Sequence, residues 1–443
     1  MKLCVCVITF LLLSIIPTLT CAATLSLQQC IDLGLEVNPH VKAYRMAIDE
    51  AEEGISEAWG AFLPTLSVNY GHTRLINNGG IGYDTDYLSQ NSDSFSVRLT
   101  QPLFTGMAGM AGLSKARQSR TYREFELQYV QQQLVFKIRQ SFNDILKEEQ
   151  LVNRWAESVG RLENQKKIAQ AWVEQQLAPR LRLLEVDVEY SNSLQQLVSA
   201  EAALVIAKAN LKEWLALPED EFLVIGGDLH QSVLREDFQQ PTFVNCSTSE
   251  SCLEQALEQR IELQLAQLNI SMAREDIKAI RARNLPRISF DAGWTDYQRE
   301  FDTDYLSEED RNYYTLSLNL SMRPFQGGKN IFAFRKQKLL IKRLEYENSR
   351  QINTIKTEVN THLERLLEGE SQISSAVIGV AAAREAYDFA DRATKLGVSS
   401  LDDLLNAEKR LTQAEINQIN AEHAIEQARI RLDYVVGSQS LIR

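Results

Sequence analysis

The sequence predicts an α+β membrane protein: four strands per chain contribute to a transmembrane β-barrel that several copies share, and this barrel is continuous with a long periplasmic α-helical barrel. Three observations predict this fold: an internal duplication, four segments of alternating apolar and polar residues, and two very long helical segments without proline. The duplication is visible in Phe104 and Gly106, which recur as Phe325 and Gly327 at an offset of 221 residues. Each copy therefore carries the same strand–strand–helix unit.

The duplication divides the chain into four parts. We expect a signal peptide in residues 1–23, a first repeat in 24–217, an equatorial linker in 218–251 and a second repeat in 252–443. In each repeat a helix precedes a strand pair, and a long helical hairpin follows it. The strand pairs are expected at 65–103 and 287–322.

The first 23 residues have the pattern of a secretory signal peptide. Lys2 precedes an apolar run over residues 3–16, and small residues close the segment at Ala23. Cys21 leaves open the alternative of a lipid-modified cysteine, although Thr20 stands where a small Gly or Ala is expected before such a site. After residue 23 no run of 18 or more apolar residues occurs, so no membrane-spanning helix is predicted in the mature chain.

The linker between the repeats reads as a small side structure rather than a separate domain, because it combines turn residues with short β-like runs. Cys246 and Cys252 stand close together in its polar end. In an oxidising compartment they could close a small disulfide loop worth about 2 kcal/mol. The alternative is two free thiols. Cys30 lies in an apolar helical pattern and is expected to be a small buried hydrophobe.

Four segments alternate apolar and polar residues over about ten positions, as a transmembrane β-strand does. A half-buried sheet in a soluble protein gives the same alternation. Aromatic residues at the strand ends, such as Tyr70 and Trp294, favour a membrane interface. Polar loops at 76–92 and 298–311 fit the cell exterior. The four strands are expected at 65–74, 93–103, 287–297 and 312–322.

Four strands cannot close a barrel, and an open sheet edge in lipid leaves backbone groups unsatisfied. Even a barrel filled by its own side chains needs about eight strands. Several copies of the chain must therefore share one barrel.

The helical segments are too long for one globular core. No proline interrupts residues 103–178, and residues 329–395 repeat this composition, so each helix would be on the order of 100 Å long. Return helices are expected at 180–215 and 401–436, with shorter helices at 39–62 and 253–284 before the strand pairs. A soluble coiled-coil rod would explain the helices and leave the strands unexplained. Gly327 and Gly328 are expected to ease a strand-to-helix turn. The glycines at the corresponding junction of the first copy are expected to serve the same transition by permitting close backbone approach: Gly106, Gly109 and Gly112.

Charge and composition argue against nucleic-acid binding and against an enzyme. The formal net charge is −12, whereas nucleic acid is bound by basic faces. The five histidines are scattered without metal-ligand spacing, and Gly327-Gly328-Lys329 lacks the flanking residues of a phosphate-binding loop. We therefore predict no catalytic, cofactor-binding or metal-binding residue and no cofactor.

Several short motifs resemble those of the TolC-like outer membrane efflux proteins, and the resemblance covers the mature chain. The most specific is the segment Leu396 to Glu408, with the sequence LGVSSLDDLLNAE. The other motifs are residues 25–31, Asn38-Pro39, Leu63-Pro64 and residues 101–106.

This resemblance implies a homotrimer in the outer membrane of a Gram-negative cell, with a large periplasmic portion. It implies a passive export conduit of a tripartite efflux or type I secretion system, docked to a periplasmic adaptor (membrane fusion) protein and an inner-membrane pump of the RND or ABC type. The alternative is an envelope-spanning structural tether without transport.

The resemblance also places partner contacts at the tips of the two helical hairpins. In the first tip, Gln176 stands where the family usually has glycine, so this tip is expected to dock differently. The residues expected to contact the adaptor are Gln176, Leu177 and Ala178 in the first tip and Leu396, Gly397, Val398 and Ser399 in the second.

Carboxylates just beyond the second tip form a periplasmic gate in some members. Asp403 matches one such acid, while Asn406 occupies the second position. Arg182 is the counterpart of Asp403 at the repeat offset, so opposite charges are expected at equal depth. The plain alternative is that the acids only begin a helix. The full set expected at the gate is Arg180, Arg182, Asp402, Asp403 and Asn406.

Overall fold

The computed structural model describes residues 24–75, 90–218, 220, 223–227, 229, 248–301 and 309–437. The expected signal peptide with Cys21, and Cys246 in the linker, lie outside these residues. The elements are α1 (Leu27–Val37), α2 (Pro39–Gly60), β1 (Thr65–Leu75), β2 (Gln90–Phe104), α3 (Ala108–Glu174), α4 (Arg180–Leu215), α6 (Ser249–Gln259), α7 (Ile261–Ala282), β3 (Arg287–Phe301), β4 (Glu309–Ser321), α8 (Lys329–Lys395) and α9 (Leu401–Val436).

The elements pack into two compact units, and the long helices α3 and α8 contribute to both. The strand unit comprises Ala43–Tyr129 and Arg260–Thr354. The hairpin unit comprises Met1–Lys42, Val130–Gln259 and Ile355–Arg443.

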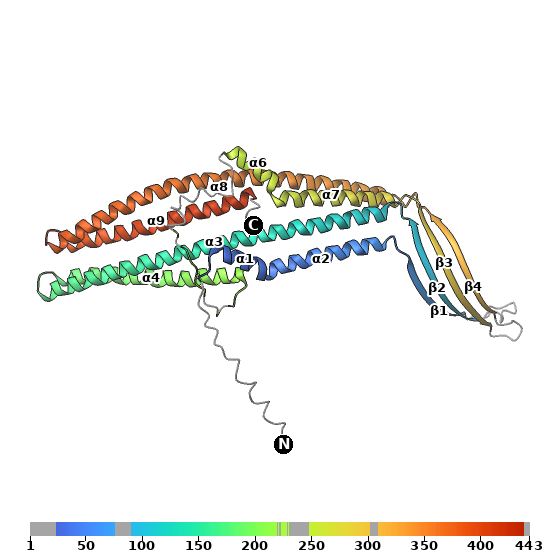
Figure 1. Ribbon diagram of the computed structural model, residues 1–443, viewed down its shortest axis with the longest axis horizontal. Helices are drawn as coiled ribbons and strands as arrows, with labels where there is room; N and C mark the ends of the chain where they lie inside the picture. The colour runs from blue at the N-terminus through green and yellow to red at the C-terminus, as the bar shows by residue number, and fades with distance from the viewer. Residues whose placement is uncertain are drawn as a thin grey trace, which may run out of the picture. The chain divides into compact units, whose positions relative to one another are not determined.

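The strand unit holds one antiparallel sheet in the order β1-β2-β3-β4, which Figure 1 shows with β1 and β4 at its edges. Its register aligns the two faces across all four strands. One row of partners is Leu66, Leu99, Ala292 and Leu316, and the adjacent row is Ser67, Arg98, Gly293 and Thr315. One face of the sheet is therefore mainly apolar and the other mainly polar, as the alternation predicts.

The turn from β2 into α3 depends on close backbone approach at Gly106. This glycine has φ 64°, and a Cβ built there would lie 2.7 Å from the carbonyl oxygen of Ala282. Gly109 is crowded by Phe62, but nothing lies within 4 Å of a Cβ at Gly112. The expectation of a close approach at Gly112 was wrong, because Gly112 lies inside the helix α3, past the turn, and on its exposed side.

In the hairpin unit, helices α3 and α4 form one hairpin, and α8 and α9 form the other. The helix α9 is the most deeply packed element, with apolar residues such as Leu404, Leu411 and Ile425 buried along its length. Leu25 makes a parallel bridge to Ile225, which ties the described part of the linker to the start of the chain.

One expected helix is divided in two. The sequence predicts a single helix over residues 253–284, whereas the structure has α6 and α7. Between them Arg260 adopts an extended conformation with ψ 119° and is buried. No helix among the described residues is long and apolar enough to cross a membrane.

Candidate functional site at the hairpin tips

The two hairpin tips have the same backbone geometry although their sequences differ. Gln176 has φ 66° and Gly397 has φ 73°. In the first tip the amides of residues 177 and 178 donate to the carbonyl of residue 172, at 2.8 and 3.3 Å. In the second tip the amides of residues 398 and 399 donate in the same way to residue 393, at 2.9 and 3.2 Å. The first tip, with Gln176, therefore presents a different side chain from the second tip, with Gly397, while the turn itself is the same.

Large apolar side chains at both tips are exposed within the chain. Leu177 is 70 % exposed, Leu396 is 79 % exposed and Val398 is 82 % exposed. Apolar side chains gathered at the end of a hairpin indicate a contact surface, because exposed apolar area is stabilised when a partner covers it.

The acid Asp403 caps the helix α9. Its carboxylate accepts hydrogen bonds from the Ser400 amide at 3.0 Å, the Ser400 hydroxyl at 2.7 Å and the Ser399 hydroxyl at 2.8 Å. The Asp403 amide donates in return to the Ser400 hydroxyl, which completes a capping box. Hydrogen bonds from Ser400 and then Ser399 lower the pKa of the Asp403 carboxyl.

The neighbouring acid, Asp402, makes the charge contact with the first hairpin. Arg182 on α4 forms an ion pair with Asp402 and a second pair with Glu185 at 3.0 Å. The sequence places Arg182 opposite Asp403, but that carboxylate is turned toward Ser400. Opposite charges therefore meet at this depth, as expected, but the acid that pairs with Arg182 is Asp402 and not Asp403.

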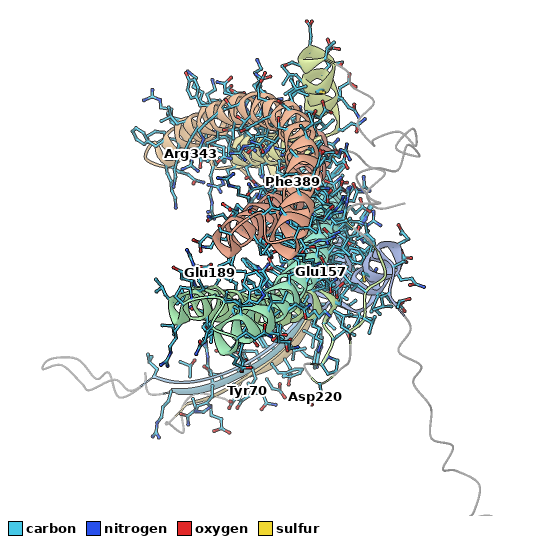
Figure 2. The ribbon with its side chains drawn as sticks, turned by 90° about the vertical axis from the view of Figure 1, so that its left-hand side faces the viewer. Tyr70, Glu157, Glu189, Asp220, Arg343 and Phe389 are labelled. Carbon is cyan, nitrogen blue, oxygen red and sulfur yellow. The ribbon has the colours of Figure 1, made fainter. Side chains whose placement is uncertain are left out.

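A second ion pair joins the same two helices. Lys409 on α9 lies 2.8 Å from Glu189 on α4, which is labelled in Figure 2. Arg180 and Asn406, also expected at the gate, are exposed and make no polar contact with other described residues.

Behind the tips lies a buried polar cluster that the sequence did not predict. Glu408 is 1 % exposed and accepts hydrogen bonds from Arg161 at 2.7 Å, Ser158 at 2.9 Å and Thr412 at 2.9 Å. A buried carboxylate requires such partners, because desolvation strongly disfavours an unpaired charge. These contacts connect α3 with α9.

The cluster extends to α8. Glu415 accepts a hydrogen bond from Arg384 at 2.7 Å and lies 3.8 Å from Arg161. Arg161 also lies over the ring of Tyr387, 5.9 Å from its centre. The arginine of the first hairpin is thus held by charged and aromatic groups of the second.

The cysteine prediction is tested only at one of its two positions. Cys252 is buried on α6 and is disulfide-bonded, which excludes a free thiol at this position, while Cys246 lies outside the described residues, so the identity of the partner stays a prediction. Cys30 is buried with a free thiol, and burial raises its pKa to about 11, in agreement with an unreactive core position. No group of three or more metal-ligating side chains is found among the residues that the structure covers.

Known proteins match nearly the whole chain. Outer membrane protein TolC of Vibrio cholerae is 19 % identical over 411 residues, covering 91 % of this chain and 89 % of TolC. Outer membrane efflux protein BepC of Brucella suis is 20 % identical, covering 91 % and 82 %. Among solved structures, CusC has a TM-score of 0.77 at 16 % identity, covering 93 % of this chain and 92 % of CusC. The open state of the MtrE outer membrane channel of Neisseria gonorrhoeae has a TM-score of 0.73 at 17 % identity, covering 93 % and 88 %.

The family described as outer membrane efflux protein matches residues 30–217 and 252–438, two segments that lie within the repeats expected from the sequence. The protein is accordingly a channel of the outer membrane with a large periplasmic part, in a family of channels rather than of enzymes. On this match the chain belongs to the outer membrane efflux protein family.

Proposed function

We propose that three copies of this chain form one export channel, with their sheets joined in a shared transmembrane β-barrel. The observation that carries the proposal is the four-stranded sheet, which has one mainly apolar face and two edges without a partner strand among the described residues. In lipid such edges must be paired. Three copies supply twelve strands, enough for an open lumen.

The apolar side chains at the edges support this arrangement. Leu316 on β4 is 75 % exposed and Leu66 on β1 is 68 % exposed, whereas Leu99 on the inner strand β2 is 42 % exposed. Lipid and neighbouring strands would cover this apolar area.

The hairpin tips would serve as the docking site for a periplasmic adaptor that delivers cargo from an inner-membrane pump, in a tripartite efflux or type I secretion system. Leu177, Leu396 and Val398 support this role, because their side chains are available to a partner hairpin. The channel itself would be passive.

The ion pair of Arg182 with Asp402 would hold the periplasmic mouth closed. One exposed pair contributes about 0–1 kcal/mol. Three symmetry-related pairs act together, so adaptor binding could release them in one step.

The test combines mass measurement with conductance. Purified protein in detergent should have the mass of a trimer, and it should conduct ions in planar bilayers. A stable monomer would refute the shared barrel, while a trimer without conductance would support a structural tether.

Docking is tested at Val398. Val398→Trp should weaken crosslinking to the adaptor and leave the trimer intact. Val205→Trp is the matched control, because Val205 is also an exposed valine but lies far from the tip, toward the other end of α4. Unchanged crosslinking in Val398→Trp would place the contact elsewhere.

A further inference from the structure

A cavity of about 430 Å³ lies in the hairpin unit, where the end of α4 meets the start of α2 beside α3 and the end of α9. All the described residues that line it belong to this one unit. A cavity of this volume can hold a small organic molecule. Neither the hairpin tips nor the sheet contributes to it, so the functions proposed above leave this cavity without a role.

The joint between α4 and α2 is made by Asn38, the first residue of the Asn38-Pro39 motif. Its side-chain amide donates a hydrogen bond to the carbonyl of Trp214 at 2.9 Å, and its side-chain oxygen accepts one from the amide of His40 at 2.8 Å. Asn38 itself is buried. It therefore fixes the end of one helix against the start of the other and holds Trp214 and His40 at the wall of the cavity.

Three aromatic residues form the walls of the cavity. The rings of Phe136 on α3 and Tyr434 on α9 stack with their centres 4.6 Å apart and their planes at 27°. Trp214 on α4 is the third, and all three side chains are half-buried. Flat aromatic surfaces of this kind favour a planar ring system as the occupant. The floor is apolar and buried, and it consists of Val41, Val130 and Leu134.

The polar groups of the cavity favour an anion. Lys137 is exposed, its ammonium lies 5.7 Å from the centre of the Phe136 ring, and it forms no ion pair with a described residue. The indole N–H of Trp214 also has no hydrogen-bond partner in the described part of the chain. No described residue that lines the cavity carries a carboxylate, although the net charge of the chain is −12. Aromatic rings attract cations, but Lys137 would repel a cation here and attract an anion.

The internal duplication indicates that hairpin packing does not require these residues. The helices α3 and α8 both have 67 residues, and α4 and α9 both have 36. The second repeat nevertheless has neither the aromatic rings nor the positive charge at the corresponding positions. At the offset of 221 the pairs are Phe136 with Thr357, Lys137 with Glu358 and Trp214 with Val435.

The cavity and the linker lie on opposite sides of α3. A Cβ built on Gly227 of the linker would be 3.5 Å from Leu146 and 3.7 Å from Phe142. Each of these residues follows a residue of the cavity by nine positions, since Lys137 precedes Leu146 and Gln133 precedes Phe142. Nine residues make two and a half helical turns, which places the members of each pair on opposite faces. A side structure around a tube lies outside it, so in the proposed channel the cavity opens toward the lumen.

We propose that this cavity is a binding site for organic anions that carry an aromatic ring, on the path of the cargo through the channel. The position on the lumen rests on the proposed export function, whereas the binding itself does not.

A binding measurement tests the chemical class of the ligand. The full-length protein in lipid nanodiscs is dialysed to equilibrium against the naphthoate anion or against naphthylmethylammonium, a cation of similar shape, with empty nanodiscs as the blank. The protein should bind naphthoate at least about fivefold more tightly than the cation, because Lys137 attracts only the anion. Absence of naphthoate binding, or a preference for the cation, would overturn the proposal.

A charge reversal locates the site. Lys137→Glu introduces the residue that the second repeat has at this position, and it should lower the affinity for naphthoate by about fivefold and reverse the preference between the two probes. Lys167→Glu is the matched control, because Lys167 is also an exposed lysine of α3 but does not line the cavity. Equal effects of the two reversals would show that naphthoate responds to the general charge of the protein.

An aromatic truncation tests the walls. Trp214→Ala should lower the affinity for naphthoate by about tenfold, since it removes one of the ring faces. Trp214→Phe should keep most of the affinity, which separates the loss of a wall from a failure to fold. Trp155→Ala, on α3 and outside the cavity, should have no effect. Unchanged affinity in Trp214→Ala would overturn the site.

Thiol labelling tests the position on the lumen. A small maleimide should label Lys137→Cys and also Asp220→Cys, a variant of an exposed linker residue that is labelled in Figure 2. A maleimide attached to a polymer too large to enter the channel should label only Asp220→Cys. Equal labelling of both variants by the polymer would overturn the lumenal position.

The outcomes separate this inference from the proposed function. A conducting trimer that fails to bind naphthoate would overturn the inference and leave the channel standing. Naphthoate binding that depends on Lys137 and Trp214, in a protein that does not conduct, would overturn the channel and leave the binding site standing.

Discussion

Gln176 and Gly397 hold the same left-handed backbone conformation at the tips of hairpins that lie 221 residues apart. Among the described residues, every non-glycine with positive φ has a glycine at this offset. The pairs are Met107 with Gly328, Gln176 with Gly397 and Ala216 with Gly437. A non-glycine residue in the left-handed conformation raises the energy of the folded state by about 1 kcal/mol. The first repeat thus forms the same three turns as the second repeat, but with non-glycine residues. These residues carry backbone strain that the glycines of the second repeat avoid.

Gln176→Gly is expected to raise the free energy of unfolding by up to about 1 kcal/mol, because glycine adopts this conformation without the steric penalty. Denaturant titration in detergent measures the change. The control is Gln175→Gly, whose amide donates to the carbonyl of Ala171 as in a helix, and which should be destabilising by about 0.5–1 kcal/mol. Equal effects of the two substitutions would contradict the strain at Gln176.

Arg182→Ala and Asp402→Ala are each expected to raise single-channel conductance, since either change removes the ion pair between α4 and α9. The double variant should conduct no better than the singles, because both remove one interaction. Asp403→Asn is the control at the adjacent position and should leave conductance unchanged, as Asp403 caps its own helix. If conductance increased only in Asp403→Asn, the residue that holds the gate would be Asp403 and not Asp402.

Arg161→Met is expected to lower the free energy of unfolding by about 3–5 kcal/mol, because it leaves the buried Glu408 without its charged partner. Adding Glu408→Leu should restore part of the loss. Arg154→Met, which removes an exposed pair with Glu157 on the same helix, should change stability by less than about 1 kcal/mol. Similar losses from the two arginines would mean that burial of the cluster is unimportant.

The acid Asp433 is expected to make stability depend on pH. Burial raises the pKa of its carboxyl, and Arg139, 3.0 Å away, opposes the rise. The folded state therefore holds the proton more tightly than the unfolded chain. The stabilisation is fully present below the ordinary aspartate pKa of about 3.9 and is lost as the pH rises through the folded pKa. Melting temperatures from acid to neutral pH should fall less steeply for Asp433→Asn than for the parent, and identical profiles would contradict the assignment.

Helix ends were predictable where the chain carries local signals. The bounds 180–215, 329–395 and 401–436 agree with α4, α8 and α9, since Pro179, Gly397 and Ser400 mark the turns between them. The break at Arg260 has no such signal, because no proline or glycine stands there and its extended backbone is set by tertiary packing.

The contacts of the site were harder to predict than its position. Arg161 and Glu408 are 247 residues apart in sequence, a separation that no local pattern reveals. One signal was available: Glu408, Glu415 and Glu422 are spaced by seven residues among the apolar residues of α9, which predicts acids on a buried helix face. Which of Asp402 and Asp403 pairs with Arg182 depends on the direction of their side chains, and the repeat offset does not specify that direction.

The open edges of the sheet have a consequence for how the channel is made. A newly exported chain carries two strands, β1 and β4, whose outer backbone groups have no partner of their own. In the proposed shared barrel, stable entry into the bilayer therefore has to coincide with association. Insertion becomes a step of high kinetic order, and its rate should fall steeply when the chain is scarce.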